Sequence, residues 1–111
     1  MKLLIRLLIN TIAVFISAYI ISGVQVDSVL TAFIVAIVLG ILNAFIKPLL
    51  VLLTLPITLL TLGLFTLVIN AFIVILVNLL VPGFVVGNII SALLFSIAVS
   101  LISTFLSSLV D

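Results

Sequence analysis

The stretch that decides the fold is Lys47-Pro48-Leu-Leu-Val-Leu-Leu-Thr-Leu-Pro56-Ile-Thr-Leu-Leu-Thr-Leu-Gly63-Leu-Phe-Thr-Leu-Val-Ile-Asn70, at the middle of the chain. It contains two of the three prolines and one of the three basic residues. If residues 48–81 formed one helix, it would be about 50 Å long, too long for a single crossing of a hydrocarbon core of about 30 Å. We therefore expect Pro56 and Gly63 to divide it into a short membrane-embedded or interfacial segment, 48–62, and a membrane span, 63–81.

The composition is that of an integral membrane protein. Of the 111 residues, 68% are hydrophobic and 5% are charged, whereas soluble domains carry about 25% charged residues. The chain has no cysteine and no histidine, so we expect no disulfide, no metal site and no cofactor. The net charge of +1 gives no reason to expect a nucleic-acid partner; the expected surroundings are the lipid bilayer, further copies of the chain and other envelope proteins.

Three further apolar runs predict three further spans, at 3–21, 28–46 and 88–109. We interpret the first as a retained span rather than a signal peptide, because no clear cleavage site follows it. Turn and kink residues separate the runs: Gly23, Pro48, Pro82 and Gly83, with Pro56 and Gly63 in the central stretch. Asp27 or Ser28 is the expected N-cap of the second span, and Lys47-Pro48 is expected to end or kink it. The predicted fold is a single all-α transmembrane domain, residues 1–111, with four spans.

The two halves of the chain align without a gap when Asn10 is placed on Asn70. The same shift places Gly23 on Gly83. We call this constant difference in residue number between the two halves the repeat offset. An asparagine within an apolar run is rarely matched by chance, so we interpret the halves as an internal duplication: two tandem helical hairpins of about 3–47 and 63–111, joined by the proline-broken segment. Many membrane proteins consist of two such repeats.

Small residues recur at every fourth position of the second and fourth spans. They are Ala32, Ala36, Gly40 and Ala44 in the second span, and Ala92, Ser96, Ser100, Thr104 and Ser108 in the fourth. Small residues at this spacing let helix backbones approach closely in lipid. We therefore expect these two spans to pack against each other along the two stripes, and we expect leucine at Gly40 or Ser100 to loosen the fold or the oligomer.

The few charges predict the orientation. Lys2, Arg6 and Lys47 share one side if the first two spans form a hairpin, and the positive-inside rule makes that side cytoplasmic. If 48–62 dips into the membrane and returns, the hairpins are parallel and both termini are cytoplasmic. If 48–62 crosses the membrane instead, the second hairpin is inverted; insertion in both orientations is a further alternative.

The spans offer amides and hydroxyls rather than ionisable groups. Proton-coupled carriers and intramembrane proteases need ionisable or catalytic groups within the membrane, so we expect neither, and no enzyme. The asparagines Asn10, Asn43, Asn70 and Asn78 are expected to bridge helices or, as the alternative, to line a path for a solute. Thr54, Thr58 and Thr61 are expected to bond to main-chain carbonyls near Pro56, or alternatively to face a water-filled path.

Several segments resemble the phage holin family, superfamily IV, of the mycobacterial four-span type. They are Leu42-Asn43-Ala44-Phe45-Ile46-Lys47-Pro48, Leu53-Thr54-Leu55-Pro56-Ile57-Thr58, Thr61-Leu62-Gly63-Leu64-Phe65, Ile69-Asn70-Ala71 and Val81-Pro82-Gly83-Phe84. The first loop, Ser22-Gly23-Val24, departs from the Pro-Gly-Phe that the family often has there. The resemblance implies a protein that accumulates in the bacterial cytoplasmic membrane, associates, and opens lesions through which a lysin reaches the cell wall.

Three functions follow as hypotheses. The first is a holin-like protein that self-associates and forms a pore or lesion. The second is a structural or envelope-stress-related membrane protein that conducts nothing. The third is a small uncoupled channel or carrier that uses the asparagines and threonines.

Overall fold

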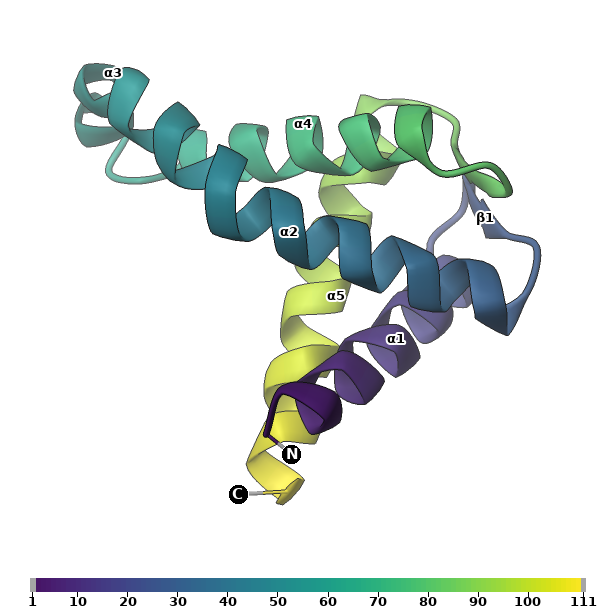
Figure 1. The fold of residues 1–111 in the computed structure, drawn as a ribbon. Coiled ribbons are helices and arrows are strands. Elements are labelled where there is room, and N and C mark those ends of the chain that lie inside the picture. Colours follow the sequence, from purple (N-terminus) through teal and green to yellow (C-terminus); the bar gives the residue numbers. More distant parts are fainter. Residues whose placement is uncertain (1, 111) are drawn as a thin grey trace.

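The computed structural model describes residues 2–110, which form five helices and two short strands (Figure 1). In chain order they are α1 (Lys2–Ile20), β1 (Val24–Val26), α2 (Val29–Leu53), α3 (Leu55–Leu60), α4 (Phe65–Leu80), β2 (Phe84–Val86) and α5 (Ile89–Val110). Of these, α1, α2 and α5 are long and apolar enough to cross a membrane, and α4 is a shorter apolar helix of 16 residues. The chain is mostly helical, with the four apolar helices of a four-span membrane protein.

The two loops pair with each other as strands, which adds to the mostly helical fold a short ladder that the sequence does not predict. β1 runs antiparallel to β2, with Val24 opposite Val86, Gln25 opposite Val85 and Val26 opposite Phe84. The sequence gives no sign of this ladder, because both strands are very short and they lie in different halves of the chain rather than across a tight turn. The pairing places both loops at one end of the molecule, which we call the strand end.

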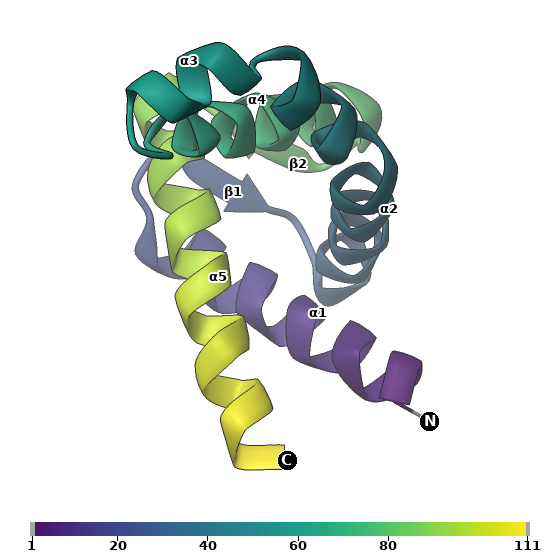
Figure 2. The same ribbon diagram turned by 90° about the vertical axis from the view of Figure 1, so that its left-hand side faces the viewer.

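From the strand end the helices diverge in two arms (Figures 1 and 2). α2 and α4 run toward α3, whereas α1 and α5 run toward the two ends of the chain. α1 and α4 each contact both α2 and α5. Within residues 2–110, no contact joins α2 to α5. The expectation that the second and fourth spans pack against each other is therefore wrong, because α1 and α4 take the contacts that we assigned to that pair.

The core is concentrated at the strand end. Its members on the four long helices lie in the last half of α1, along α4 and in the first halves of α2 and α5. The two largest fully buried side chains, Phe84 and Phe95, lie against each other with a ring-centroid distance of 5.4 Å. Away from the strands the helices expose apolar side chains, as expected of surfaces that face lipid.

The second span does not end at Lys47-Pro48, which corrects its expected boundary. α2 continues through Pro48 to Leu53, because a proline removes only one N–H donor and membrane helices tolerate that loss. The helix breaks at Thr54, and Pro56 lies in the first turn of α3, where a missing N–H leaves no bond unmade. α3 then ends in a Schellman-type turn, in which the Gly63 N–H donates to the Thr58 carbonyl over 2.8 Å.

The two halves of the structure correspond at the repeat offset. β1 and β2 begin and end at corresponding positions. Gly23 and Gly83, which precede them, have φ of 90° and 88°. Ser28 and Asn88 accept hydrogen bonds from the N–H groups of Thr31 and Ser91, and so cap α2 and α5 in the same way. The expected N-cap at Ser28 is confirmed.

Candidate functional site

A polar crevice opens between α1, α2 and α5 on the side of the core away from the strands. It has a volume of about 250 Å³. Its polar lining consists of Asn10, Asn43, Ser100, Ser103 and Thr104, and its remaining lining consists of Val14, Ala36, Leu39, Gly40 and Val99. No charged side chain of residues 2–110 lines it. Its chemistry is hydrogen bonding by amides and hydroxyls.

One hydrogen bond crosses the crevice wall between helices that are far apart in the sequence. The Ser103 hydroxyl on α5 donates to the Asn10 amide oxygen on α1 over 3.0 Å. Asn10 thus bridges helices, one of the two roles that its position in an apolar run predicts. Ser103 was not singled out from the sequence; the signal for it is that Asn43 falls on Ser103 at the repeat offset, just as Asn10 falls on Asn70.

The Asn10–Ser103 pair of α1 and α5 corresponds at the repeat offset to Asn70 of α4 and Asn43 of α2. Asn43 is exposed and lines the crevice, whereas Asn70 is half-buried. In the part of the chain that the structure describes, no hydrogen bond joins these two amides. Asn43 therefore brings an amide group to the crevice with capacity for a further partner.

The two small-residue stripes are buried near the strands and exposed beyond them. Ala32 and Ala92 are fully buried, and Ala36 and Ser96 are 3% and 8% exposed. The outer members, Gly40, Ala44, Ser100 and Thr104, are all exposed. A Cβ added to Gly40 would meet no atom within 4 Å. The outer half of each stripe thus lacks the helix partner that its spacing predicts, and it faces the crevice or the surface.

The central threonines bond to their own helices rather than to the crevice. The Thr54 hydroxyl donates to the Leu50 carbonyl over 2.7 Å, and the Thr61 hydroxyl donates to the Ile57 carbonyl over 3.0 Å. The Thr54 and Thr58 hydroxyls lie 3.5 Å apart. These bonds supply partners to main-chain carbonyls around the break between α2 and α3. None of the three side chains lines the crevice.

Asn78 and the turn glycines belong to the strand end. The Asn78 amide oxygen accepts a hydrogen bond from the Val86 N–H over 3.1 Å. The positive φ of Gly23 and Gly83 suits glycine, and each glycine lies close to the segment that follows the other strand. A Cβ at Gly23 would collide with Ser91, and one at Gly83 would collide with Asp27. Pro82 is exposed in the turn before β2.

The basic residues lie in the parts of the helices away from the strands. Lys2 and Arg6 on α1 line a notch of about 160 Å³ with Ser107 of α5. Lys47 lines an apolar groove on the other arm with Asn43 and Pro48. Asp27 directly follows β1 at the strand end, so it lies at the opposite end from these basic residues. Residues 2–110 contain no group of His, Cys, Asp or Glu that could hold a metal ion.

Comparisons with known proteins cover nearly the whole chain. A family model described as mycobacterial 4 TMS phage holin, superfamily IV, matches residues 1–105. The uncharacterized membrane protein YvlD of Bacillus subtilis (strain 168) is 41% identical over 70 residues, which are 63% of this chain and 59% of the relative. The uncharacterized protein SCO3922 of Streptomyces coelicolor is 46% identical over 52 residues, which are 47% of this chain and 42% of the relative. The matches thus span about half the length of these relatives, and no solved structure matches significantly.

Proposed function

We propose that this chain, which belongs to the mycobacterial 4 TMS phage holin family of superfamily IV, self-associates in the bacterial cytoplasmic membrane and forms a pore or lesion. The family is one of membrane proteins rather than enzymes, and the coarse conclusion, a holin-like bacterial membrane protein, follows from membership. The finer proposal depends on one observation: the crevice presents amides, hydroxyls and the exposed halves of two small-residue stripes at membrane depth.

Exposed polar groups at that depth favour association. An amide or hydroxyl that faces hydrocarbon without a partner costs free energy, and a second copy of the chain supplies the partner. Asn43, Ser100 and Thr104 are the groups that gain most, because all three are exposed. Gly40 leaves room beside them for a helix backbone to approach closely.

A conducting path would have to lie between copies. Toward the strands the crevice ends at a packed layer of Val14, Ala36 and Val99, which are 1%, 3% and 8% exposed. That layer leaves no continuous polar route along the described part of a single chain. Several copies that turn their crevices toward a common axis would produce a continuous polar route. Its lining of amides and hydroxyls suits an uncoupled pore.

The proposed topology places both chain ends in the cytoplasm. Lys2 and Arg6 lie in the first turns of α1 and Lys47 lies in the last third of α2, in both cases in the part of the helix away from the strands, so the positive-inside rule favours a cytoplasmic position for those parts and an outside position for the paired strands. The pairing of the two loops favours parallel hairpins over inverted ones. The same pairing, and the matching strand bounds and glycine conformations, support an internal duplication with repeats of about 3–47 and 63–111.

The test is dye release from liposomes, together with the oligomeric state in the same membranes. Wild-type protein at rising protein-to-lipid ratio is expected to associate and to release a trapped dye. Gly40→Leu is expected to abolish both without lowering the thermal unfolding temperature, because a Cβ at this position meets no neighbouring atom within 4 Å and leucine is a better helix former than glycine. Gly40→Ala is the matched control and is expected to retain association and release.

The same experiment separates the alternatives. Association without dye release, and without loss of membrane potential on induced expression, would contradict the pore and support the non-conducting structural protein. Dye release from a monomer that Gly40→Leu leaves unaffected would contradict the oligomer and support a path within one chain.

A further inference from the structure

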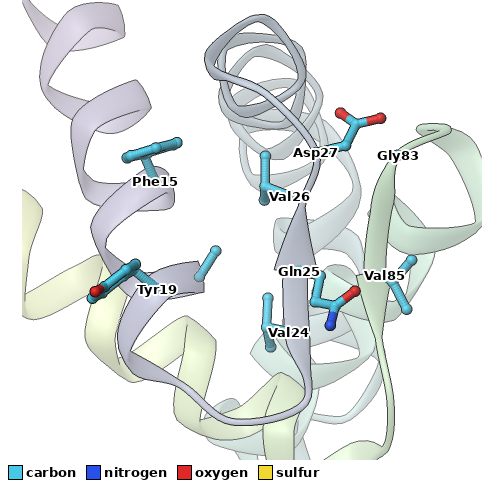
Figure 3. A pocket seen from close by; sticks show the side chains of 9 residues that line it. Phe15, Tyr19, Val24, Gln25, Val26, Asp27, Gly83 and Val85 are labelled. Atoms are coloured by element: carbon cyan, nitrogen blue, oxygen red, sulfur yellow. The ribbon is translucent and has the colours of Figure 1, made fainter.

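A second cavity, larger than the crevice, lies at the strand end. It has a volume of about 490 Å³ and lies between the last turns of α1 and the outer edge of β1 (Figure 3). Ala18 lines it from α1. So do Phe15 and Tyr19, while Val24, Gln25 and Val26 line it from β1, and Asp27 stands at its rim beside Gly83 and Val85 (Figure 3). This volume is within the range of small-molecule and cofactor sites.

The strand edge beside the cavity carries an unpaired main-chain donor. The Asp27 N–H donates across the ladder to the Gly83 carbonyl, and the Gly87 N–H donates to the Gly23 carbonyl. Because antiparallel bonds alternate along a strand, the N–H groups of Val26 and Val86 point away from the partner strand. The Val86 N–H finds the Asn78 amide oxygen at 3.1 Å, whereas among residues 2–110 no acceptor is recorded for the Val26 N–H.

A single substitution between the halves accounts for both the cavity and the missing acceptor. At the repeat offset Asn78 of α4 corresponds to Ala18 of α1, and Val86 corresponds to Val26. Asn78 fills the space beside β2 and satisfies its edge. Ala18 has neither the volume nor the oxygen to do the same beside β1, and it lines the cavity directly.

The remaining lining defines what would occupy the site. Phe15 and Tyr19 are exposed aromatic side chains at the end of a membrane helix, where such rings meet lipid headgroups. The Asp27 carboxylate accepts a hydrogen bond from the Thr31 hydroxyl. It is far from the basic residues: on α1, whose last residue lies near the strands, Arg6 is about 20 Å from that end at a rise of about 1.5 Å per residue. The occupant therefore needs an acceptor oxygen, an apolar body and a cationic group.

We propose that this cavity binds an amine-bearing phospholipid from the outer leaflet. A phosphate or ester oxygen accepts a hydrogen bond from the Val26 N–H, as the Asn78 amide oxygen does from the Val86 N–H beside β2. The headgroup ammonium lies at the rim near Asp27, and an acyl chain leaves along Phe15 and Tyr19. Phosphatidylethanolamine has these three features, whereas phosphatidylglycerol lacks the ammonium. The site does not depend on the proposed pore, which uses the opposite face of the core; only its assignment to the outer leaflet rests on the proposed topology.

The experiment is native mass spectrometry of the full chain released from mixed vesicles of phosphatidylethanolamine and phosphatidylglycerol. Wild-type protein is expected to retain phosphatidylethanolamine in preference. Ala18→Asn, which copies the arrangement beside β2, is expected to lower retention about tenfold, the factor that corresponds to about 1.4 kcal/mol. The thermal unfolding temperature of delipidated Ala18→Asn is expected to equal or exceed the wild-type value, because the asparagine fills the cavity.

Two further variants make the result decisive. Asp27→Asn keeps a hydrogen-bonding group beside Thr31 and removes the charge, so it is expected to retain lipid but lose the preference for the amine. Asn78→Ala is expected to open a matching cavity beside β2, where Gly87 stands at the position that corresponds to Asp27. This variant is expected to retain additional lipid, with no preference for the amine. Equal retention by wild type and Ala18→Asn, or an unchanged preference in Asp27→Asn, would overturn the proposal.

Discussion

The strand end and the opposite end of the molecule are built from the same four helices but are packed differently. Near the strands, Ala32 and Ala92 are fully buried and Phe84 lies against Phe95. A few turns further along the same helices, Gly40, Ala44, Ser100 and Thr104 are exposed. The ladder between the loops holds the helices together at one end only. Small residues at this spacing therefore mark a surface that another helix can approach closely. Near the strands the chain's own helices cover that surface, whereas at the opposite end it remains exposed.

The largest expected effect is the loss of a core ring from the strand end. Phe95 and Phe105 both lie on α5, but Phe95 is 0% exposed and Phe105 is 63% exposed. Phe95→Ala is expected to lower the free energy of unfolding by about 3 kcal/mol, because the neighbours cannot close the cavity. Phe105→Ala is expected to change it little. Unfolding in mixed micelles measures both, and equal losses would refute the one-ended packing.

Three glycines provide the next test. Gly83 has φ of 88° and faces Asp27, Gly63 has φ of 89° with nothing within 4 Å, and Gly40 has the same open space in a helix. Gly83→Ala is expected to cost about 2 kcal/mol from backbone strain plus a displaced side chain. Gly63→Ala is expected to cost about 1 kcal/mol from strain alone. Gly40→Ala is expected to gain up to about 1 kcal/mol in helix propensity. A different order of the three unfolding temperatures would contradict this assignment of strain and space.

The smallest expected effect concerns the hydrogen bond between Asn10 and Ser103, at the end of the molecule away from the strands. A double-mutant cycle with Asn10→Ala and Ser103→Ala is expected to give a coupling free energy of about 0.6 kcal/mol, as for other hydrogen bonds between membrane helices. Ser100→Ala, also in the crevice, is the control and is expected to show no coupling with Asn10. Coupling as large for Ser100 as for Ser103 would show that the crevice responds as a unit rather than through this bond.

The sequence predicts the strand end less well than it predicts the membrane helices. Long uncharged runs predict four apolar helices, and Ser28 is recognisable as an N-cap from its type and place. The ladder is not predictable, because Val24–Val26 has no local partner. The rule for residues before proline predicts that the second span ends or kinks at Lys47-Pro48. The helix continues to Leu53, because this rule describes a preference that a long apolar helix overrides. Asn10 was recognised because amides are rare in apolar runs, whereas Ser103 is one serine among many on α5.

The pairing of β1 with β2 also has a consequence for biogenesis. Residues 24–26 leave the ribosome long before their partners at 84–86, so in the proposed topology the first hairpin enters the membrane while Gln25 still has no partner strand and bonds to water. The ladder can close only after the second hairpin has crossed and Val85 has reached the same side. Its closure therefore marks the completion of insertion: a chain that stalls before residue 84, or that inserts its second hairpin upside down, keeps an open strand edge that distinguishes it from the finished protein.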